Sequence, residues 1–499
     1  MELTTVKEAM TSEQDATLRS IEEWLESPGA EDPSPGLSVG ESLKRAAITE
    51  AGANLSGCLE LDELLQPPDV GYALCRIWME QCVGSPRQVL RGASLAHDSL
   101  KRYRWESDEF AEREALLCSL ALICWRASRL LNLSREGQEW FSAYTRHFRS
   151  SPDWDAAYHE WSSLDRWQEL RSADLRILGG ETVFRMLIQL QEDAESDPHT
   201  VRLKAICMYR CLKHTTAFPA DLHSYFQGEA SRLIGSSFRV TGRYSEAHDW
   251  LDRAESHYRA GADPEPHLAL VFFLRLTILY GQTQLEPILR AAPILDRRLA
   301  RLGMEEYRVK SGILWASSLK ISGQPKTALQ VLEGFRRSMP SIGPRLMGWV
   351  LAEIGDCHAM CGDDEFGINE LEKAAELMRR ERQLTGLAQV NSMIGGICRG
   401  RGLLPEALQL FLTSVDDYER LGMAVSAAYI RILVAETYLA MESPRKAEEE
   451  VLAALPVLEG QGVVPDTLVA LSLLREAIRR QKLEPQMLRN LHDRLRPDR

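Results

Sequence analysis

Residues 233–247 read LIGSSFRVTGRYSEA, the clearest copy of a pattern that returns about every 40 residues in the second half of the chain. The pattern places a small or apolar residue in a first helix, a turn seven positions later, and a small residue twelve positions after the first. In this copy the three positions hold Gly235, Gly242 and Ala247. Glycine adopts the left-handed conformation that ends a helix at little cost, so Gly242 predicts a tight turn. The stretch therefore predicts two antiparallel helices.

Six copies of this pattern follow one another, and their first positions, here called anchors, are 41, 40, 39, 40 and 40 residues apart. A small anchor lets the second helix approach closely, and a large apolar residue sixteen positions later fills the groove between the helices. One hairpin cannot bury its apolar face alone, so consecutive hairpins are expected to stack into a solenoid. The anchors are Gly235, Leu276, Ala316, Gly355, Gly395 and Ala435, and the turn positions are Gly242, Thr283, Gly323, Gly362, Gly402 and Glu442.

The copies resemble tetratricopeptide repeats. The residues that carry this resemblance are the anchor, the turn glycine, Tyr244, and the small residues Ala247 and Ala254 of the second helix. The usual unit has 34 residues, so these units look like the longer variant of bacterial regulatory proteins and kinesin light chains. The copy around Leu276 departs from the pattern, because it lacks the turn glycine and has prolines in its second helix. The resemblance implies an all-α fold, a right-handed α-solenoid of stacked antiparallel hairpins.

Changes in composition divide the chain into four parts. Residues 1–69 form an acidic segment with one or two short helices, the first predicted over residues 12–26, and a Pro/Gly linker. Residues 70–225 read as divergent helical hairpins. Residues 226–460 hold the six repeats, and residues 461–499 read as capping helices.

The charge is uneven along the chain. The formal net charge is −13, and residues 1–70 hold 15 Asp and Glu against 4 Lys and Arg, a net of −11. The rest of the chain is therefore nearly neutral, without the basic stripe of a nucleic-acid-binding protein. The longest nearly apolar run, residues 115–125, is too short to span a membrane. Since no apolar leader is found either, we expect a cytoplasmic protein that binds neither nucleic acid nor membrane.

Two cysteine–histidine clusters raise the question of metal binding. One contains Cys207, Cys211 and His214 on one helix face, and the other surrounds His358. Neither has the paired CxxC spacing of a zinc site, so packing in the core is the favoured interpretation, with a metal or a Cys–His nucleophile as alternatives. The sequence also lacks a Gly-rich phosphate loop. We expect no catalytic residue, no cofactor, no metal and no enzymatic activity.

The resemblance implies that the first helix of each hairpin lines a concave surface. Placing the repeats in register predicts exposed cationic and aromatic side chains there, a mixture that suits an acidic and apolar peptide or helix. No asparagine follows an anchor, so the carboxylate clamp of co-chaperones of this family is not carried over. The predicted partner-binding residues are Arg232, Arg239, Phe273, Tyr280, Lys310, Lys320, Trp349, Arg399 and Tyr429.

These features predict a non-enzymatic scaffold or adaptor that binds a protein or peptide partner in the concave groove. The alternative is a bacterial regulatory protein that sequesters a sigma factor, a transcription factor or a protease by binding alone. A further hypothesis concerns the acidic segment: residues 1–65 fold back into the groove and compete with the partner, since a short tether gives a high effective concentration.

Overall fold

The computed structural model describes residues 75, 82–83, 86–102, 110–150, 164–194, 197–282, 284–338, 342–459 and 486–489. Every regular element in these ranges is a helix, as expected for an all-α fold. Within them, no helix is both long and apolar enough to cross a membrane. The acidic segment 1–69 and most of the expected capping segment 461–499 lie outside the described residues.

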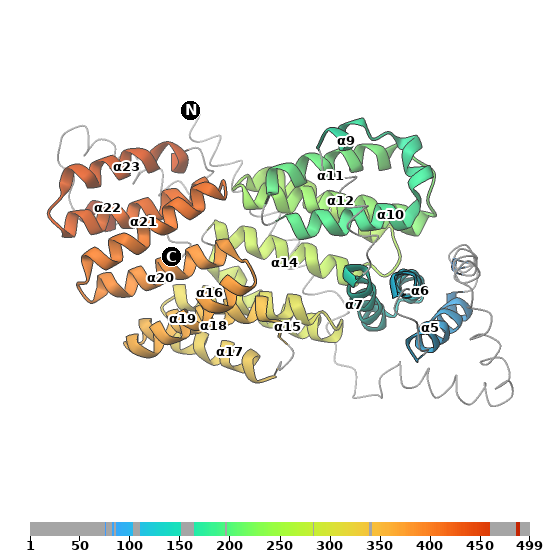
Figure 1. Ribbon diagram of the computed structural model, residues 1–499, viewed down its shortest axis with the longest axis horizontal. Coiled ribbons are helices and arrows are strands. Elements are labelled where there is room, and N and C mark those ends of the chain that lie inside the picture. The colour runs from blue at the N-terminus through green and yellow to red at the C-terminus, as the bar shows by residue number, and fades with distance from the viewer. Residues whose placement is uncertain are drawn as a thin grey trace.

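Helices alternate with short turns along the whole described chain (Figure 1). The helices are α5 (Pro86–Arg102), α6 (Phe110–Leu130), α7 (Ser134–Ser150), α9 (Leu164–Glu169), α10 (Ser172–Asp193), α11 (Pro198–Lys213), α12 (Ala220–Val240), α13 (Tyr244–Arg259), α14 (Glu265–Gly281), α15 (Leu285–Arg301), α16 (Glu305–Ile321), α17 (Pro325–Ser338), α18 (Pro344–Met360), α19 (Asp364–Arg380), α20 (Leu384–Gly400), α21 (Leu404–Arg420), α22 (Ala424–Ala440) and α23 (Pro444–Glu459).

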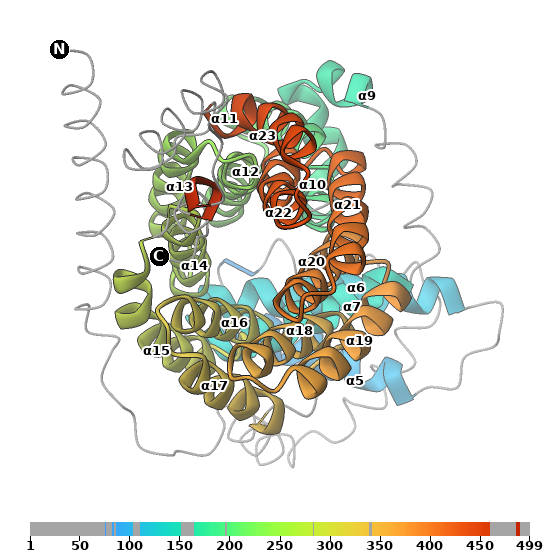
Figure 2. The same cartoon turned by 90° about the vertical axis from the view of Figure 1, so that its left-hand side faces the viewer.

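The helices from α12 to α23 form six antiparallel hairpins that stack side by side into a solenoid. Figure 2 shows that α12, α14, α16, α18, α20 and α22 follow the inner side of the curve. Their partners in each hairpin lie mostly on the outer side. The first helix of each hairpin therefore lines the concave face, as the resemblance implied.

The anchors make the contacts that their spacing predicted. A Cβ atom built on Gly355 would lie 2.7 Å from the carbonyl oxygen of Gly367 and 2.8 Å from Cγ of Leu371. These two residues stand twelve and sixteen positions after the anchor. A Cβ on Gly235 would likewise lie 3.2 Å from the carbonyl oxygen of Ala247. In these two hairpins the helices thus approach so closely that the anchor has to be small.

The turns between the helices also follow the prediction. Gly242, Gly323, Gly362 and Gly402 have φ angles of 74°, 75°, 89° and 79°, in the left-handed region that glycine adopts without strain. Glu442 takes the same conformation, with φ 55°, in the last repeat. Thr283, the turn position of the second repeat, lies outside the described residues. The turn position therefore takes the left-handed conformation even in the last repeat, where the residue is not glycine.

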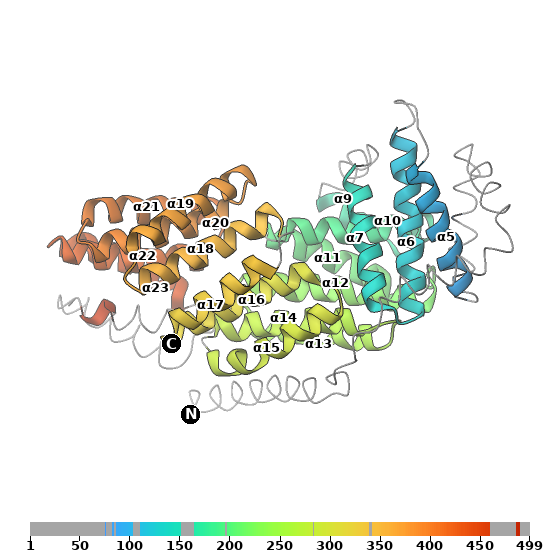
Figure 3. The same ribbon diagram turned by 90° about the horizontal axis from the view of Figure 1, so that it is seen from below.

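The N-terminal hairpin α6–α7 stands steeply against the solenoid helices and packs on its first repeats (Figure 3). Arg126 of α6 is buried and donates two hydrogen bonds, of 3.1 and 3.0 Å, to the Asp221 carboxylate of α12. Arg129 donates to the carbonyl oxygen of Ala262, and its guanidinium lies 4.7 Å from the Tyr225 ring centre. Such bidentate and stacked arginine contacts are directional, so they fix the hairpin in one orientation.

Replacing Gly355 by alanine is expected to lower the free energy of unfolding by about 1–3 kcal/mol, because the new methyl group collides with backbone atoms of α19. Gly396 is the matched control on α20, since a Cβ there meets nothing within 4 Å. Gly396→Ala should raise the free energy of unfolding by roughly 0.5–1 kcal/mol through helix propensity. Urea unfolding followed by circular dichroism measures both. Equal midpoints for the two variants would contradict the close contact at the anchor.

Candidate partner-binding surface

The predicted binding residues all lie on the inner helices, but they differ in exposure. Arg232, Phe273 and Lys320 are buried, with 5%, 9% and 8% of their surface exposed. The expectation that these three side chains are exposed is therefore wrong. The other six are half-buried, and they are Arg239, Tyr280, Lys310, Trp349, Arg399 and Tyr429.

Lys320 of α16 is held by two carboxylates of the next inner helix. Its Nζ lies 2.9 Å from Oε2 of Glu353 and 2.5 Å from Oδ2 of Asp356, both on α18. Burial alone would lower the pKa of the Lys320 amine, but Asp356 and Glu353 raise it well above its usual value. The amine is therefore charged at neutral pH, and its charge is used within the chain. With two acids for one base, this cluster carries an excess of negative charge.

Arg399 of α20 forms a similar contact two hairpins further along the chain. Its guanidinium donates to Glu436 of α22. In both cases the base stands four positions after an anchor, and an acid stands one position after the next anchor: Lys320 with Asp356, and Arg399 with Glu436. We call these contacts the inter-repeat pairs. They connect neighbouring inner helices across the concave face.

Arg232 of α12 belongs to a buried polar network. It donates to Gln191 of α10 at 2.8 Å and to Glu229 at 2.6 Å. Tyr258 of α13 donates to the other oxygen of Glu229 at 2.5 Å, and its ring stacks on His267 of α14. Burial alone would lower the pKa of Arg232, but Glu229 raises it well above its usual value. The network joins four helices at the start of the solenoid. It uses the positive charge of Arg232, which was expected to bind a partner, within the chain.

The cations of the concave face are thus largely neutralised by the chain itself. Lys310 also forms an ion pair, of 2.8 Å, with Glu306 of its own helix and lies over the Tyr307 ring. Together with Arg232, Lys320 and Arg399, four of the five predicted cations are bonded to carboxylates of this chain. The structure therefore contradicts the expectation of a positively charged groove.

The aromatic residues of the inner helices keep part of their surface accessible. Trp349 of α18 is half-buried, and a Cβ on Gly386 of α20 would lie 3.1 Å from its ring. Tyr429 of α22 is half-buried beside the core of α20, α21 and α22. Gly396, between them on α20, faces open space. This end of the concave face therefore has partly accessible aromatic rings on α18 and α22, and a glycine without neighbouring atoms on α20.

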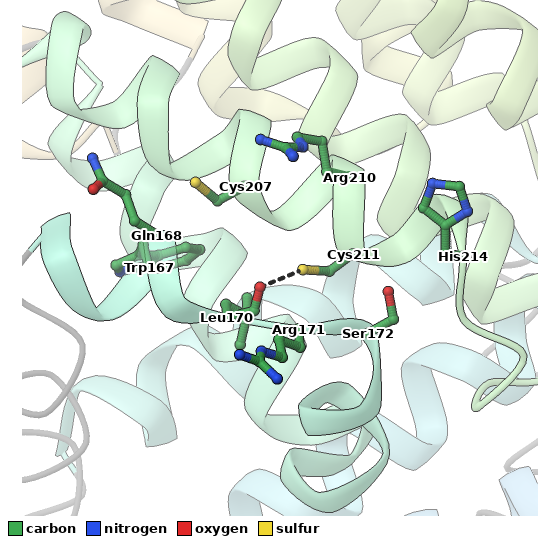
Figure 4. A pocket seen from close by; sticks show the side chains of 9 residues that line it. All are labelled: Trp167, Gln168, Leu170, Arg171, Ser172, Cys207, Arg210, Cys211 and His214. Atoms are coloured by element: carbon green, nitrogen blue, oxygen red, sulfur yellow. Dashed lines mark hydrogen bonds between the residues drawn. The ribbon is translucent and has the colours of Figure 1, made fainter.

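The Cys207 cluster lines a pocket between α9 and α11 that was not predicted (Figure 4). Cys211 Sγ donates a hydrogen bond to the Leu170 carbonyl oxygen at 3.1 Å. Burial raises the pKa of the Cys211 thiol to about 11, and it also raises the pKa of Cys207. A protonated thiol is a poor nucleophile and a poor metal ligand. The pocket has a volume of about 320 Å³ and is lined by Trp167, Gln168, Leu170, Arg171, Ser172, Cys207, Arg210, Cys211 and His214.

The second cluster is also part of the packing. Burial raises the pKa of the Cys357 thiol to about 12. His358 contacts the ring of Phe366, with ring centres 4.3 Å apart. Across the ranges that the structure describes, no three His, Cys, Asp or Glu side chains are placed to hold a metal ion.

Comparison with known proteins finds similarity only among solved structures. No protein-family model matches the sequence, and no curated protein does. A Rap protein complexed with competence and sporulation factor is 12% identical, with a TM-score of 0.43, over 88% of this chain and 99% of that one. Aspartyl phosphate phosphatase F from Bacillus subtilis is 15% identical, with a TM-score of 0.41, over 79% and 95%. Both TM-scores lie below 0.5, so neither similarity supports a conclusion about this chain.

Replacing Lys320 by methionine should lower the free energy of unfolding by about 3 kcal/mol, because two carboxylates lose their cation in a buried site. Lys326→Met is the control, since Lys326 is exposed on α17. Adding Glu353→Gln and Asp356→Asn to Lys320→Met should recover most of the loss. Urea midpoints of the four proteins measure the effect. A Lys320→Met variant as stable as the control would show that the pair does not hold the repeats together.

Proposed function

We propose that this protein is a non-enzymatic scaffold whose concave face binds a segment of a peptide or protein partner. The observation that supports this most is the set of half-buried aromatic side chains on inner helices: Tyr280, Trp349 and Tyr429. A solenoid presents such side chains on a fixed curved surface, so a partner loses little free energy to reorganisation of the site. Aromatic residues of this kind commonly dominate binding energy.

The chemistry of the partner follows from the ion pairs. Lys320 and Arg399 already bind acids of the next repeat, so an acidic partner would have to displace Asp356 or Glu436. An apolar or uncharged segment needs no such exchange, because it gains by covering the rings of Trp349 and Tyr429. We therefore favour an apolar segment over the acidic and apolar one expected from the sequence. A regulator that sequesters its partner would use the same surface.

Trp349→Ala combined with Tyr429→Ala should weaken partner binding by about 2 kcal/mol or more, roughly 30-fold, because it removes the two rings that the partner covers. Phe366→Ala is the matched control, since Phe366 is exposed at the start of α19, next to the turn that follows inner helix α18. The tagged protein captures its partner from native lysate, and titration with the purified partner then gives the three affinities. Equal affinities of the double variant and wild type would place the interface elsewhere.

The fold-back of residues 1–65 lies outside the described residues and stays a prediction. Its charge rationale is weaker now that the groove cations are paired, but its apolar residues Leu18, Ile21 and Trp24 suit an aromatic surface. A tethered segment acts at an effective concentration near millimolar, so weak contact suffices. Deleting residues 1–65 should raise the measured partner affinity at least about threefold. An unchanged affinity would reject the fold-back.

A further inference from the structure

A chain of three buried titratable side chains connects α5, α6 and α7, far from the proposed binding surface. His147 Nδ1 of α7 lies 2.8 Å from Oε2 of Glu114 on α6. His147 Nε2 lies 3.3 Å from Nε2 of His97 on α5. The exposed fractions of His97, Glu114 and His147 are 1%, 6% and 7%. Each of the three helices contributes one member, so we call this set the Glu114–His147–His97 relay.

The relay accepts protons only up to a limit. An ionised Glu114 can only accept a hydrogen bond, so His147 Nδ1 carries a hydrogen. His147 Nε2 then accepts from His97 Nε2–H when both rings are neutral. If both rings become protonated, two N–H groups point at each other across 3.3 Å and the contact turns repulsive. The link between α5 and α7 therefore requires that at least one ring is neutral.

The surroundings of the relay favour neutral rings at pH 7. On α5 the charged neighbours are Asp98, whose Oδ1 lies 3.9 Å from His97 Nδ1, and Lys101. On α6 Arg113 lies 3.6 Å from Glu114, and on α7 Arg146 faces His147. The Trp140 ring packs edge-on against His97, with ring centres 5.0 Å apart. These groups leave little solvent to stabilise a second positive charge.

We propose that the Glu114–His147–His97 relay is an acid-sensitive latch that holds α5 on the α6–α7 hairpin. The apolar side chains of α5 pack on apolar side chains of α6 and shield them from water, and we call these α6 side chains the apolar patch. Acidification releases α5 and exposes this apolar patch to water. The apolar patch consists of Leu116, Leu117, Leu120, Ile123, Cys124 and Ala127.

The direction of the pH effect follows from burial. Desolvation lowers the pKa of both His97 and His147, despite the raising effects of Asp98 and Glu114. Released rings take up protons near the ordinary histidine pKa of about 6.5. The latch is therefore complete above about pH 6.5 and weakens as the pH falls below it, by up to about tenfold per histidine for each pH unit.

Hydrogen–deuterium exchange of the full chain at pH 7.5 and 5.5, corrected for intrinsic exchange rates, tests the latch. Peptides from α5 should lose protection at least about tenfold more than peptides from α20 at the lower pH. His97→Gln preserves a hydrogen-bonding side chain that cannot be protonated and leaves His147 as the one titratable ring of the pair, so its α5 should lose about tenfold less protection than wild-type α5. The control His199→Gln, at an exposed position, should behave as wild type. Unchanged α5 protection in wild type, or an acid-induced loss in His97→Gln as large as in wild type, would overturn the proposal.

If His97→Gln releases α5 at both pH values, the wild-type protein still decides the question. Nuclear magnetic resonance of histidine labelled at Cε1 follows the two rings, which the His97→Gln and His147→Gln spectra assign. We expect both rings to titrate below pH 6.5 together with the loss of α5 protection. Titration of both rings while α5 remains protected would overturn the latch.

Discussion

The close contact between a small anchor and the second helix of its hairpin is the constraint on which the solenoid depends. At Gly355 the backbone of α19 lies so near that even a methyl group would meet it. This contact sets the distance between α18 and α19, and the left-handed turn at Gly362 sets their direction. A backbone contact recurs at Gly235, and at Gly395 the Phe411 side chain of the second helix takes the space of a Cβ, so these hairpins take similar shapes and stack with their first helices on the concave side.

The inter-repeat pairs add a second level of order. Lys320 reaches Glu353 and Asp356 on the following inner helix, and Arg399 reaches Glu436. Buried pairs of this kind cost desolvation and are sensitive to geometry, so they favour one orientation of neighbouring repeats. They also leave the concave face with little free positive charge. Lys320 and Arg399, which the sequence of a single repeat predicts to bind a partner, thus connect neighbouring repeats in the solenoid.

The sequence predicted the repetitive part of this fold well, because spacing carries it. The anchors and the turns follow from a period of about 40 residues, whereas the inner position of the first helices was implied by the resemblance to tetratricopeptide repeats. The burial of Arg232, Phe273 and Lys320 was missed, because the exposure of a side chain depends on helices outside its own repeat: α10 for Arg232, α16 for Phe273 and α18 for Lys320. A signal was present for Lys320, since Asp356 stands 36 residues later, and the same base–acid pattern returns with Arg399 and Glu436.

Contacts outside the repeats could not be predicted in this way. The Arg126–Asp221 contact and the relay between Glu114, His147 and His97 join residues 95, 33 and 50 positions apart, without any period. The pocket beside Cys211 needs the short helix α9, which no pattern indicated. Such contacts are set by the packing of whole helices, and a single sequence holds no spacing rule for them.

The salt dependence of partner affinity tests the central claim most directly, namely that the concave face recognises an apolar segment while its cations hold the repeats together. Affinity of the captured partner would be measured by calorimetry at 50 and 500 mM sodium chloride, with urea midpoints recorded at both concentrations as a control for folding. Screening weakens exposed charge attraction over this range but leaves apolar contact intact. Recognition of an apolar segment predicts a change in affinity below about threefold. A loss of tenfold or more, with the fold intact, would show that free cations of the concave face bind an acidic partner.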